Sequence, residues 1–425
     1  MDSKRTRKER AILCGCPLKA SRLAASKGRD RFTPEESLEE LRSLVISAGG
    51  EVVEQVLQEC IQYHPATLIG RGKLEELAEM RKQKKADLVV FDESLFPAQQ
   101  RNVEQRIGCR VIDRTQLILD IFARRARTRE GKLQVELAQL NDLLPRLTGK
   151  GVELSRLGGG IGTRGPGETK LETDIRKIRR RIHTIKLALE HVRTQRALHR
   201  GLRSSVPVAM ISLVGYTNAG KSTLFTLLTR AETLASQQVF ATLDPLLRRL
   251  PLPSKRQAVL SDTVGFINKL PTSLVSAFRA TLEEIGQASL LLHVIDVSVP
   301  HWPQQRQSVL EVLDSLGYAS RPILEVYNKI DLVSSTLVPD SRYPAVPISA
   351  IQGTGISHLL KTIDELLDQD SLIRATFMFD HRHSHYVSQL HAQSRLIKET
   401  YTEDGVRVEV EAPSSLVQKF KPFQI

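Results

Sequence analysis

A chain of 425 residues and 47.6 kDa exceeds the size that one hydrophobic core usually supports, so we expect two or three domains. Its apolar content of 41% is sufficient for such cores. No apolar run reaches the roughly 18 to 20 residues that cross a bilayer, and the start MDSKRTRKER lacks the apolar stretch of a signal peptide. The sequence therefore predicts a cytoplasmic protein without a membrane span, and we expect a monomer.

The net charge of +13 is distributed unevenly along the chain. Residues 201–370 contain 14 Lys and Arg against 15 Asp and Glu, whereas the rest of the chain contains 47 against 33. Basic flanks around a neutral block indicate a polyanionic partner, nucleic acid before membrane, or simply solvated Lys and Arg side chains. Charge alone does not separate these two interpretations.

Residues 11 to about 125 alternate short apolar runs with helical patterns. Four runs are typical of strands, AILCG, EVVEQVL, ADLVVFD and CRVID, and helical patterns lie between them. This alternation predicts a parallel α/β domain over residues 1–125. Within it Gly70 and Gly72 precede a helix, where a phosphate could bind, but two glycines favour a plain turn.

The chain has four cysteines, at positions 14, 16, 60 and 109. Cys14-x-Cys16 has no second ligand pair at zinc-finger spacing. We therefore interpret the cysteines as buried thiols rather than as a metal site.

Two segments carry apolar residues at alternating steps of three and four. The sets are Leu133, Leu137, Leu140, Leu144 and Leu147, and then Leu171, Ile175, Ile178, Ile182, Ile185, Leu189 and Val192. This repeat favours an antiparallel coiled-coil hairpin over residues 126–200, the alternative being two amphipathic helices lying on a core. Residues 171–200 contain nine Lys or Arg against three Asp or Glu, so the outer face of the second helix should be basic.

A glycine-rich stretch, KGVELSRLGGGIGTRGPGET, lies between these two helices. Eight glycines fall between Gly149 and Gly167, a composition that buries no apolar face and is costly to order. Its cations and the one that follows it are Lys150, Arg156, Arg164 and Lys170. We predict that these four residues contact an RNA backbone, the alternative being a flexible linker.

A P-loop motif follows the predicted buried strand VAMISLV. The segment GYTNAGKS lets backbone amides surround phosphates, Lys221 reach the β and γ phosphates, and the Ser222 hydroxyl bind Mg²⁺. The predicted nucleotide contacts of this loop are Gly215, Asn218, Ala219, Gly220, Lys221, Ser222 and Thr223. An asparagine at the position of Asn218 helps hold K⁺ beside the phosphates in some P-loop GTPases, so K⁺ is a second candidate ion.

Two further segments follow in the order that a GTPase requires. FATLD places Thr242 to close over Mg²⁺ and the γ phosphate. AVLSDTVG places Asp262 at a strand end, where it would hold Mg²⁺ through a water, and Gly265 where its amide senses the γ phosphate. We predict Lys221, Thr242 and Gly265 as the catalytic residues.

The base is read by two other strand ends. LEVYNKID supplies Asn328, Lys329 and Asp331, and the Asp331 carboxylate can accept two hydrogen bonds from guanine, whereas adenine has no matching donors. Ser349 and Ala350 follow a further strand, where their backbone can meet the base oxygen. Together these motifs exclude a generic P-loop ATPase or kinase and predict a GTPase domain over residues 201–370.

The residue after DTVG usually helps to align the attacking water in a GTPase, and here it is Phe266. A phenylalanine cannot hold a water. The chain is therefore either a slow GTPase whose water is aligned by a group from outside the motif, or a nucleotide-switched binding protein with incidental turnover. A tRNA-processing GTPase would need a further catalytic or cofactor domain that the sequence does not indicate.

Together with GGGIGTRGPGETKLETD, the motifs GYTNAGKST, FATLDP, DTVGF, NKID and SA closely resemble the HflX family of translational GTPases. The resemblance covers nearly the whole chain, including DRTQLILDIFARRARTREGKLQVELAQL. It implies GTP hydrolysis, binding to the large ribosomal subunit and its rRNA, and splitting of stalled ribosomes under stress. One departure is Leu246-Leu247, where the family pattern leads us to expect polar residues.

The last part of the chain, residues 371–425, is predicted to form a small α+β appendage. SRLIKETYTEDGVRVEVEA has the alternation of a β-hairpin with a turn at Asp404-Gly405. His381, His383 and His385 are spaced by two without a nearby cysteine, so we interpret them as surface or RNA-facing residues rather than metal ligands.

Overall fold

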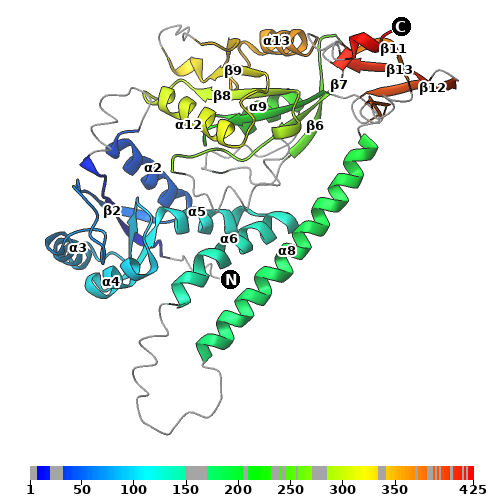
Figure 1. Ribbon diagram of the computed structural model, residues 1–425. Helices are drawn as coiled ribbons and strands as arrows, with labels where there is room; N and C mark the ends of the chain where they lie inside the picture. The colour runs from blue at the N-terminus through cyan, green and yellow to red at the C-terminus, as the bar shows by residue number, and fades with distance from the viewer. Residues whose placement is uncertain are drawn as a thin grey trace, which may run out of the picture.

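The computed structural model contains three β-sheets in the part of the chain that it describes (Figure 1). The described residues are 7–19, 32–148, 170–203, 209–230, 240, 246–254, 257–269, 285–333, 341–368, 372–380, 386–387, 390–391, 394–402, 405–413, 416–417 and 420–425. The mixed α/β class is confirmed, while the predicted domain boundaries at 125, 200 and 370 stay predictions. Among these residues no helix is long and apolar enough to span a membrane.

The first sheet, here the N-terminal sheet, has four parallel strands in the order β2-β1-β3-β4. The strands are β1 (Arg10–Gly15), β2 (Glu51–Leu57), β3 (Leu88–Phe91) and β4 (Arg110–Asp113), and the helices are α2 (Pro34–Ser47), α3 (Arg71–Lys84), α4 (Pro97–Ile107) and α5 (Arg114–Arg125). Thr33 closes a capping box with Glu36 at the start of α2, and Asp113 caps α5. The predicted alternation of strands and helices is confirmed.

The cysteines all belong to this first part of the fold. Cys14 and Cys16 are fully buried with their sulfur atoms 3.6 Å apart, whereas Cys60 and Cys109 are only half-buried. The contact with Cys14 and burial raise the pKa of the Cys16 thiol. The prediction of buried thiols therefore holds for the first pair and is wrong for the other two.

Two helices, α6 (Arg129–Thr148) and α8 (Lys170–Arg203), run side by side in opposite directions (Figure 1). The Arg181 guanidinium donates to the Glu136 carboxylate at 2.6 and 2.7 Å across this pair, and Ile185 is fully buried. The antiparallel hairpin is thus confirmed. However, Val135 and Ala138 on another face of α6 are buried in the core that α5 also lines, so α6 lies both on that core and against α8.

The second sheet has six strands in the order β10-β9-β8-β5-β7-β6, parallel except for the edge strand β6. Its strands are β5 (Ala209–Gly215), β6 (Leu246–Pro251), β7 (Gln257–Asp262), β8 (Leu290–Asp296), β9 (Ile323–Asn328) and β10 (Ala345–Pro347), with helices α9 (Lys221–Thr229), α12 (Trp302–Ser315) and α13 (Ile356–Asp368). Leu246 and Leu247 open the edge strand β6, half-buried. The P-loop, DTVG, NKID and Ser349-Ala350 follow the carboxyl ends of β5, β7, β9 and β10, the usual ligand edge of such sheets, whereas FATLD lies between α9 and β6.

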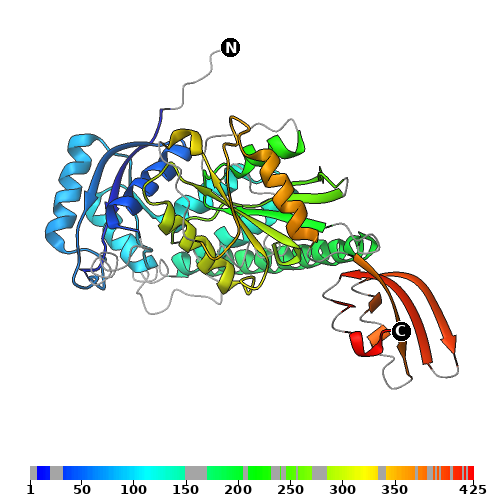
Figure 2. The same ribbon diagram turned by 90° about the horizontal axis from the view of Figure 1, so that it is seen from above.

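The third sheet is antiparallel, in the order β11-β13-β12, and lies near the carboxyl end of α8 in both views (Figures 1 and 2). Its strands are β11 (Leu372–Phe379), β12 (Arg395–Thr402) and β13 (Gly405–Pro413). The predicted hairpin is confirmed by the pairing of β12 with β13. Its turn residue Asp404 and the histidines at 381, 383 and 385 lie outside the described residues.

Candidate nucleotide-binding site

The P-loop connects β5 to α9, and two of its positions accept only glycine. A Cβ atom at Gly215 would lie 2.3 Å from the Val294 carbonyl oxygen of the neighbouring strand β8. A Cβ atom at Gly220, whose φ is +92°, would lie 2.2 Å from the Asn328 side-chain nitrogen. Asn218 has a φ of 62° and is exposed at the tip of the loop. The glycines are therefore needed for close packing as well as for access to phosphates.

Lys221 is buried at the start of α9, and its amine points back along the loop. Nζ donates to the carbonyl oxygens of Gly215 at 3.0 Å and Tyr216 at 2.7 Å. Burial lowers the pKa of Lys221 to about 8, although the nearby Asp262 carboxylate opposes this shift. An anionic phosphate beside Nζ would favour the charged amine further, so the position is suited to an anionic ligand.

Two oxygen-bearing side chains lie together next to Lys221. The Ser222 hydroxyl donates to Asp262 Oδ2 at 2.9 Å, and Asp262 is fully buried at the end of β7. Mg²⁺ prefers such hard oxygen donors, so this pair fits the ion that the sequence predicts. Thr223 is half-buried in the first turn of α9, and Thr242, the other predicted Mg²⁺ ligand, lies outside the described residues.

The DTVG segment packs directly on the P-loop. A Cβ atom at Gly265 would lie 3.0 Å from Lys221 Nζ and 3.0 Å from Thr217. The next residue, Phe266, donates its amide to Gly215 O at 3.1 Å and accepts from the Thr217 amide at 2.8 Å. These bonds form an isolated parallel bridge between Tyr216 and Phe266 beyond the end of the β5–β7 pairing.

The Phe266 side chain is only 3% exposed and belongs to a hydrophobic cluster that extends from the second sheet to the N-terminal sheet. Phe266 is therefore a packing residue that anchors the end of DTVG. Any group that aligns the attacking water must come from elsewhere. Sequence reasoning identified what Phe266 cannot do but missed this packing role, which its position beside a buried apolar Ile267 could have indicated.

The Asn328 side chain connects the base-reading loops with the P-loop. Nδ2 donates to the Ala219 carbonyl at 2.9 Å, and Oδ1 accepts from the Ala350 amide at 3.0 Å. Ser349 beside Ala350 is fully buried and accepts the Gln352 amide at 3.2 Å. One amide side chain therefore holds three of the predicted nucleotide-binding segments in register.

Of the neighbouring base-reading residues, Lys329 is half-buried and Asp331 is exposed. Lys329, which has a φ of 67°, donates to Asp296 at 2.6 Å, a partner that the sequence analysis did not single out although it ends the strand LLLHVID. Asp331 is exposed in the short 3-10 helix Ile330–Leu332, accessible to a base. The described nucleotide residues thus gather at one sheet edge, and their individual roles stay predictions.

The described residues give no position at this sheet edge for the four predicted RNA contacts. Lys150, Arg156 and Arg164 lie outside the described residues, and Lys170 is described only as the first residue of α8. These four positions remain sequence predictions.

Three family profiles match consecutive parts of the chain. They are described as GTP-binding GTPase N-terminal, over residues 35–123, GTP-binding GTPase Middle Region, over 125–203, and 50S ribosome-binding GTPase, over 210–329. The GTPase HflX of Caldanaerobacter subterraneus subsp. tengcongensis is 46% identical over 391 residues, 92% of this chain and 91% of that protein. The GTPase HflX of Escherichia coli K12 is 45% identical over 384 residues, 89% of this chain and 90% of that protein.

The chain belongs to the HflX family of GTPases. The resemblance seen in the sequence is confirmed, and with it the activity: the chain is a GTP-binding protein that hydrolyses GTP. Among solved structures, a crystal structure of SsGBP in complex with GDP is 26% identical, with a TM-score of 0.47, and covers 85% of this chain and 99% of that one.

Proposed function

We propose that this HflX-family GTPase binds the large ribosomal subunit and uses GTP binding and hydrolysis to split ribosomal subunits or keep them apart, under stress and in the cytoplasm. The observation that carries this proposal is the 34-residue rod α8. Arg176, Lys177, Arg179 and Arg180 are all exposed along it. The match to a profile described as 50S ribosome-binding GTPase supports the same partner.

A rod with a basic outer face suits an RNA surface because each neutralised phosphate releases counterions. The glycine-rich stretch with Lys150, Arg156 and Arg164 follows directly on the other arm of the hairpin, so it would extend the same surface. We propose that α8 and these cations, with Lys170, contact rRNA, while the nearly neutral block 201–370 carries the nucleotide chemistry.

For that chemistry we propose that Ser222 and Thr242 bind Mg²⁺ and that Asp262 holds it through a water. When bound, Mg²⁺ neutralises charge that develops on the β and γ phosphates. Lys221 would hold the same phosphates, and the Gly265 amide would contact the γ phosphate. Since Phe266 is packed away from this space, the group that aligns the water would be supplied by a docked subunit.

The deciding experiment is GTP hydrolysis in single turnover, with and without purified large subunits. We expect a free rate of about 10⁻⁴ to 10⁻³ s⁻¹, the order of the intrinsic rate of an unstimulated small GTPase, and at least a tenfold increase with subunits. Equal rates in both conditions would favour the second candidate, a nucleotide-switched RNA- or ribosome-binding protein with incidental turnover.

K⁺ is a separate proposal that rests on Asn218. This residue is exposed at the tip of the P-loop, where its side chain is accessible to an ion beside the phosphates. Rates measured in potassium and in sodium at equal ionic strength test it, and identical rates would remove K⁺ from the site.

A further inference from the structure

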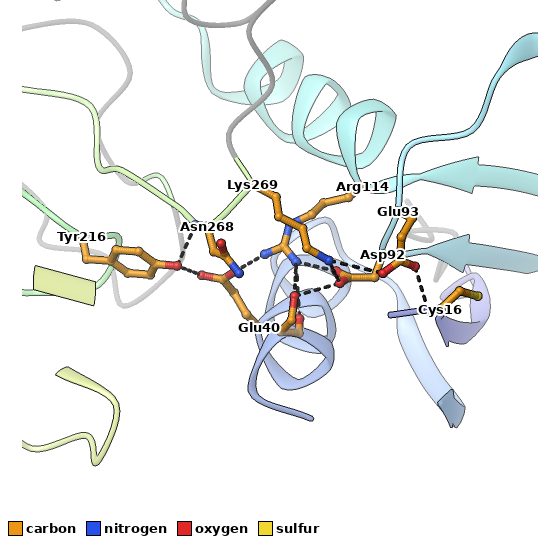
Figure 3. Close-up of polar contacts among 9 residues, drawn as sticks. Cys16, Glu40, Asp92, Glu93, Arg114, Tyr216, Asn268 and Lys269 are labelled. Atoms are coloured by element: carbon orange, nitrogen blue, oxygen red, sulfur yellow. Dashed lines mark hydrogen bonds and ion pairs between the residues drawn. The ribbon is translucent and has the colours of Figure 1, made fainter. Parts of the chain in front are cut away.

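The N-terminal sheet and the nucleotide-binding sheet meet at a polar cluster that no sequence motif contains (Figure 3). From the N-terminal side come Glu40 of α2, Asp92 and Glu93 after β3, and Arg114 of α5. From the nucleotide side comes Lys269, four residues after Gly265, at the end of the described segment 257–269. The cluster therefore connects DTVG directly to a different sheet.

The N-terminal side of this cluster has more negative than positive charge. Arg114 is only 2% exposed and binds both Glu40 and Asp92, while the Ser37 hydroxyl donates to Asp92 at 2.7 Å. Two carboxylates thus bind one guanidinium, Asp92 is 3% exposed, and Glu93 follows Asp92 in the chain as a third carboxylate of the cluster. Charges in such surroundings need partners, because water is largely excluded.

Lys269 supplies the second cation. Its amine binds Asp92 and lies 3.3 Å from Glu93, which in turn accepts the Cys16 amide at 2.8 Å. Burial raises the pKa of Glu93, and Lys269 opposes this shift. The Lys269 side chain is itself 41% exposed, so the pairing is reversible rather than fixed by a closed core.

Tyr216, the P-loop residue that follows Gly215, makes a second connection between the N-terminal sheet and the nucleotide-binding sheet. Its hydroxyl donates to Glu40 and accepts the Asn268 amide at 2.7 Å (Figure 3). The hydroxyl of the P-loop residue Tyr216 is therefore hydrogen-bonded to the backbone of Asn268, the residue before Lys269. A movement of either segment changes the contacts of the other.

A third connection lies in the FATLD motif. Phe240 is 2% exposed, and its ring packs on Phe122 of α5 with centroids 4.4 Å apart. Phe240 has a φ of 59°, an unfavourable backbone conformation for a residue of this size, which the surrounding packing must hold. Thus Phe240, the first residue of FATLD, contacts helix α5, and Lys269, which follows DTVG, contacts the loop after β3.

We propose that Lys269 and Phe240 are positioning residues through which the N-terminal sheet sets the relative affinity of the site for GTP and GDP. Gly265 lies four residues before Lys269, so a shift of DTVG toward the γ phosphate strains or breaks the contacts of Lys269 with Asp92 and Glu93. Phe240 in turn holds the start of the FATLD segment against Phe122. By thermodynamic linkage, residues that do not contact the nucleotide then change the affinity for GTP relative to the affinity for GDP. The inference needs only the GTPase activity and is independent of the ribosomal partner.

The test measures dissociation constants of the full-length protein for fluorescent GDP and for a non-hydrolysable GTP analogue. The variants are Lys269→Met, and Glu93→Gln and Phe122→Leu on the N-terminal side. We expect the ratio of the two constants to change at least fivefold in Lys269→Met, the lower end of ordinary coupling between sites, and in the same direction in an N-terminal variant. Lys269→Arg should keep the wild-type ratio.

Lys361→Met is the matched control, because Lys361 is an exposed lysine on α13 that pairs with Glu365 at 3.7 Å, within its own helix. Its ratio should equal that of the wild type. Ratios within twofold of wild type in all three test variants would overturn the proposal. A change confined to Lys269→Met would also overturn it, since the effect would then lie within the nucleotide-binding part. If Phe122→Leu does not fold, Glu93→Gln decides.

Discussion

The nucleotide site and the cluster around Arg114 both hold charged side chains away from water, but they are assembled differently. Lys221 is surrounded by the backbone of its own loop, with carbonyls of Gly215 and Tyr216 within hydrogen-bonding distance. Arg114 is surrounded by side chains from α2 and from the end of β3. The Lys221 amine is held by backbone dipoles of its own loop even without a ligand, whereas the buried Arg114 guanidinium is stable only with its carboxylate partners in place.

The largest difference should appear when the central cation is removed from each site. Lys221→Met should lower GTP hydrolysis by about 10²- to 10³-fold, because a preorganised donor to the phosphates is lost. Its thermal unfolding should change less than that of Arg114→Met, since the nearby buried carboxylate of Asp262 keeps the Ser222 hydroxyl as a hydrogen-bond partner. Single-turnover hydrolysis and a melting curve check both points; a wild-type rate would contradict the assigned role.

Guanine selection offers a second way to test the nucleotide side. Asp331→Asn should shift preference from GTP toward xanthosine triphosphate, since the amide presents a donor where the carboxylate accepts. We expect the GTP affinity to fall by about 10²-fold or more, as for other polar contacts left unmatched. Competition binding with GTP, XTP and ATP measures this. If ATP competes equally with GTP in the wild type, the assignment of Asp331 fails.

A substitution of Arg114 should lower the free energy of unfolding rather than the rate of GTP hydrolysis. Arg114→Met leaves Glu40 without its cation and Asp92 with Lys269 alone, and should destabilise the protein by about 3–5 kcal/mol. The control is Arg181→Gln, which breaks an exposed pair with Glu136 and should cost far less stability than Arg114→Met. Denaturant unfolding compares the two, and similar losses would show that burial of the pair does not matter.

A buried histidine in β8 predicts an acid sensitivity of the nucleotide-binding sheet. Burial lowers the pKa of His293 to about 4, despite the opposing carboxylate of Glu325. Above pH 6.5 the ring is neutral in both states and contributes nothing. As the pH falls from 6.5 toward 4, only the unfolded chain gains the proton, so stability decreases, by about 2 kcal/mol at pH 5.

Urea unfolding at pH 7.5 and pH 5 measures this loss, and His293→Asn isolates it because other titrating groups are unchanged. The variant should lose less stability than the wild type between the two pH values. Equal losses in both proteins would mean that His293 does not titrate between the folded and unfolded states as described.

The smallest expected effect concerns the outer face of α8. Arg180→Gln should lower the slope of log affinity against log salt for large subunits by up to about 0.9, the contribution of one phosphate contact. Nucleotide binding should be unaffected, since α8 supplies none of the predicted nucleotide residues. Co-sedimentation over a salt series measures the slope, with Lys361→Gln as the control. An unchanged slope would place Arg180 outside the RNA contact.

The elements of the N-terminal and nucleotide-binding sheets were predictable because their patterns are local. A strand such as EVVEQVL and a helix start such as Thr33 to Glu36 are determined by neighbours in sequence. The hairpin was predictable from its repeat for the same reason. That α6 also buries Val135 and Ala138 was not, because the leucine repeat describes only one of its faces.

The sequence by itself determined the family, the GTPase chemistry and the residues that gather at the sheet edge, because motifs such as GYTNAGKS are contiguous and carry their geometry in their spacing. Only the tertiary structure decided what Phe266 does and that Lys269 meets Asp92 and Glu93. Asp92 and Glu93 lie 177 and 176 positions before Lys269 in the chain, and in the sequence they look like ordinary surface charges. Their energetic role arises from burial between two sheets, and burial is a property of the packed chain rather than of any segment.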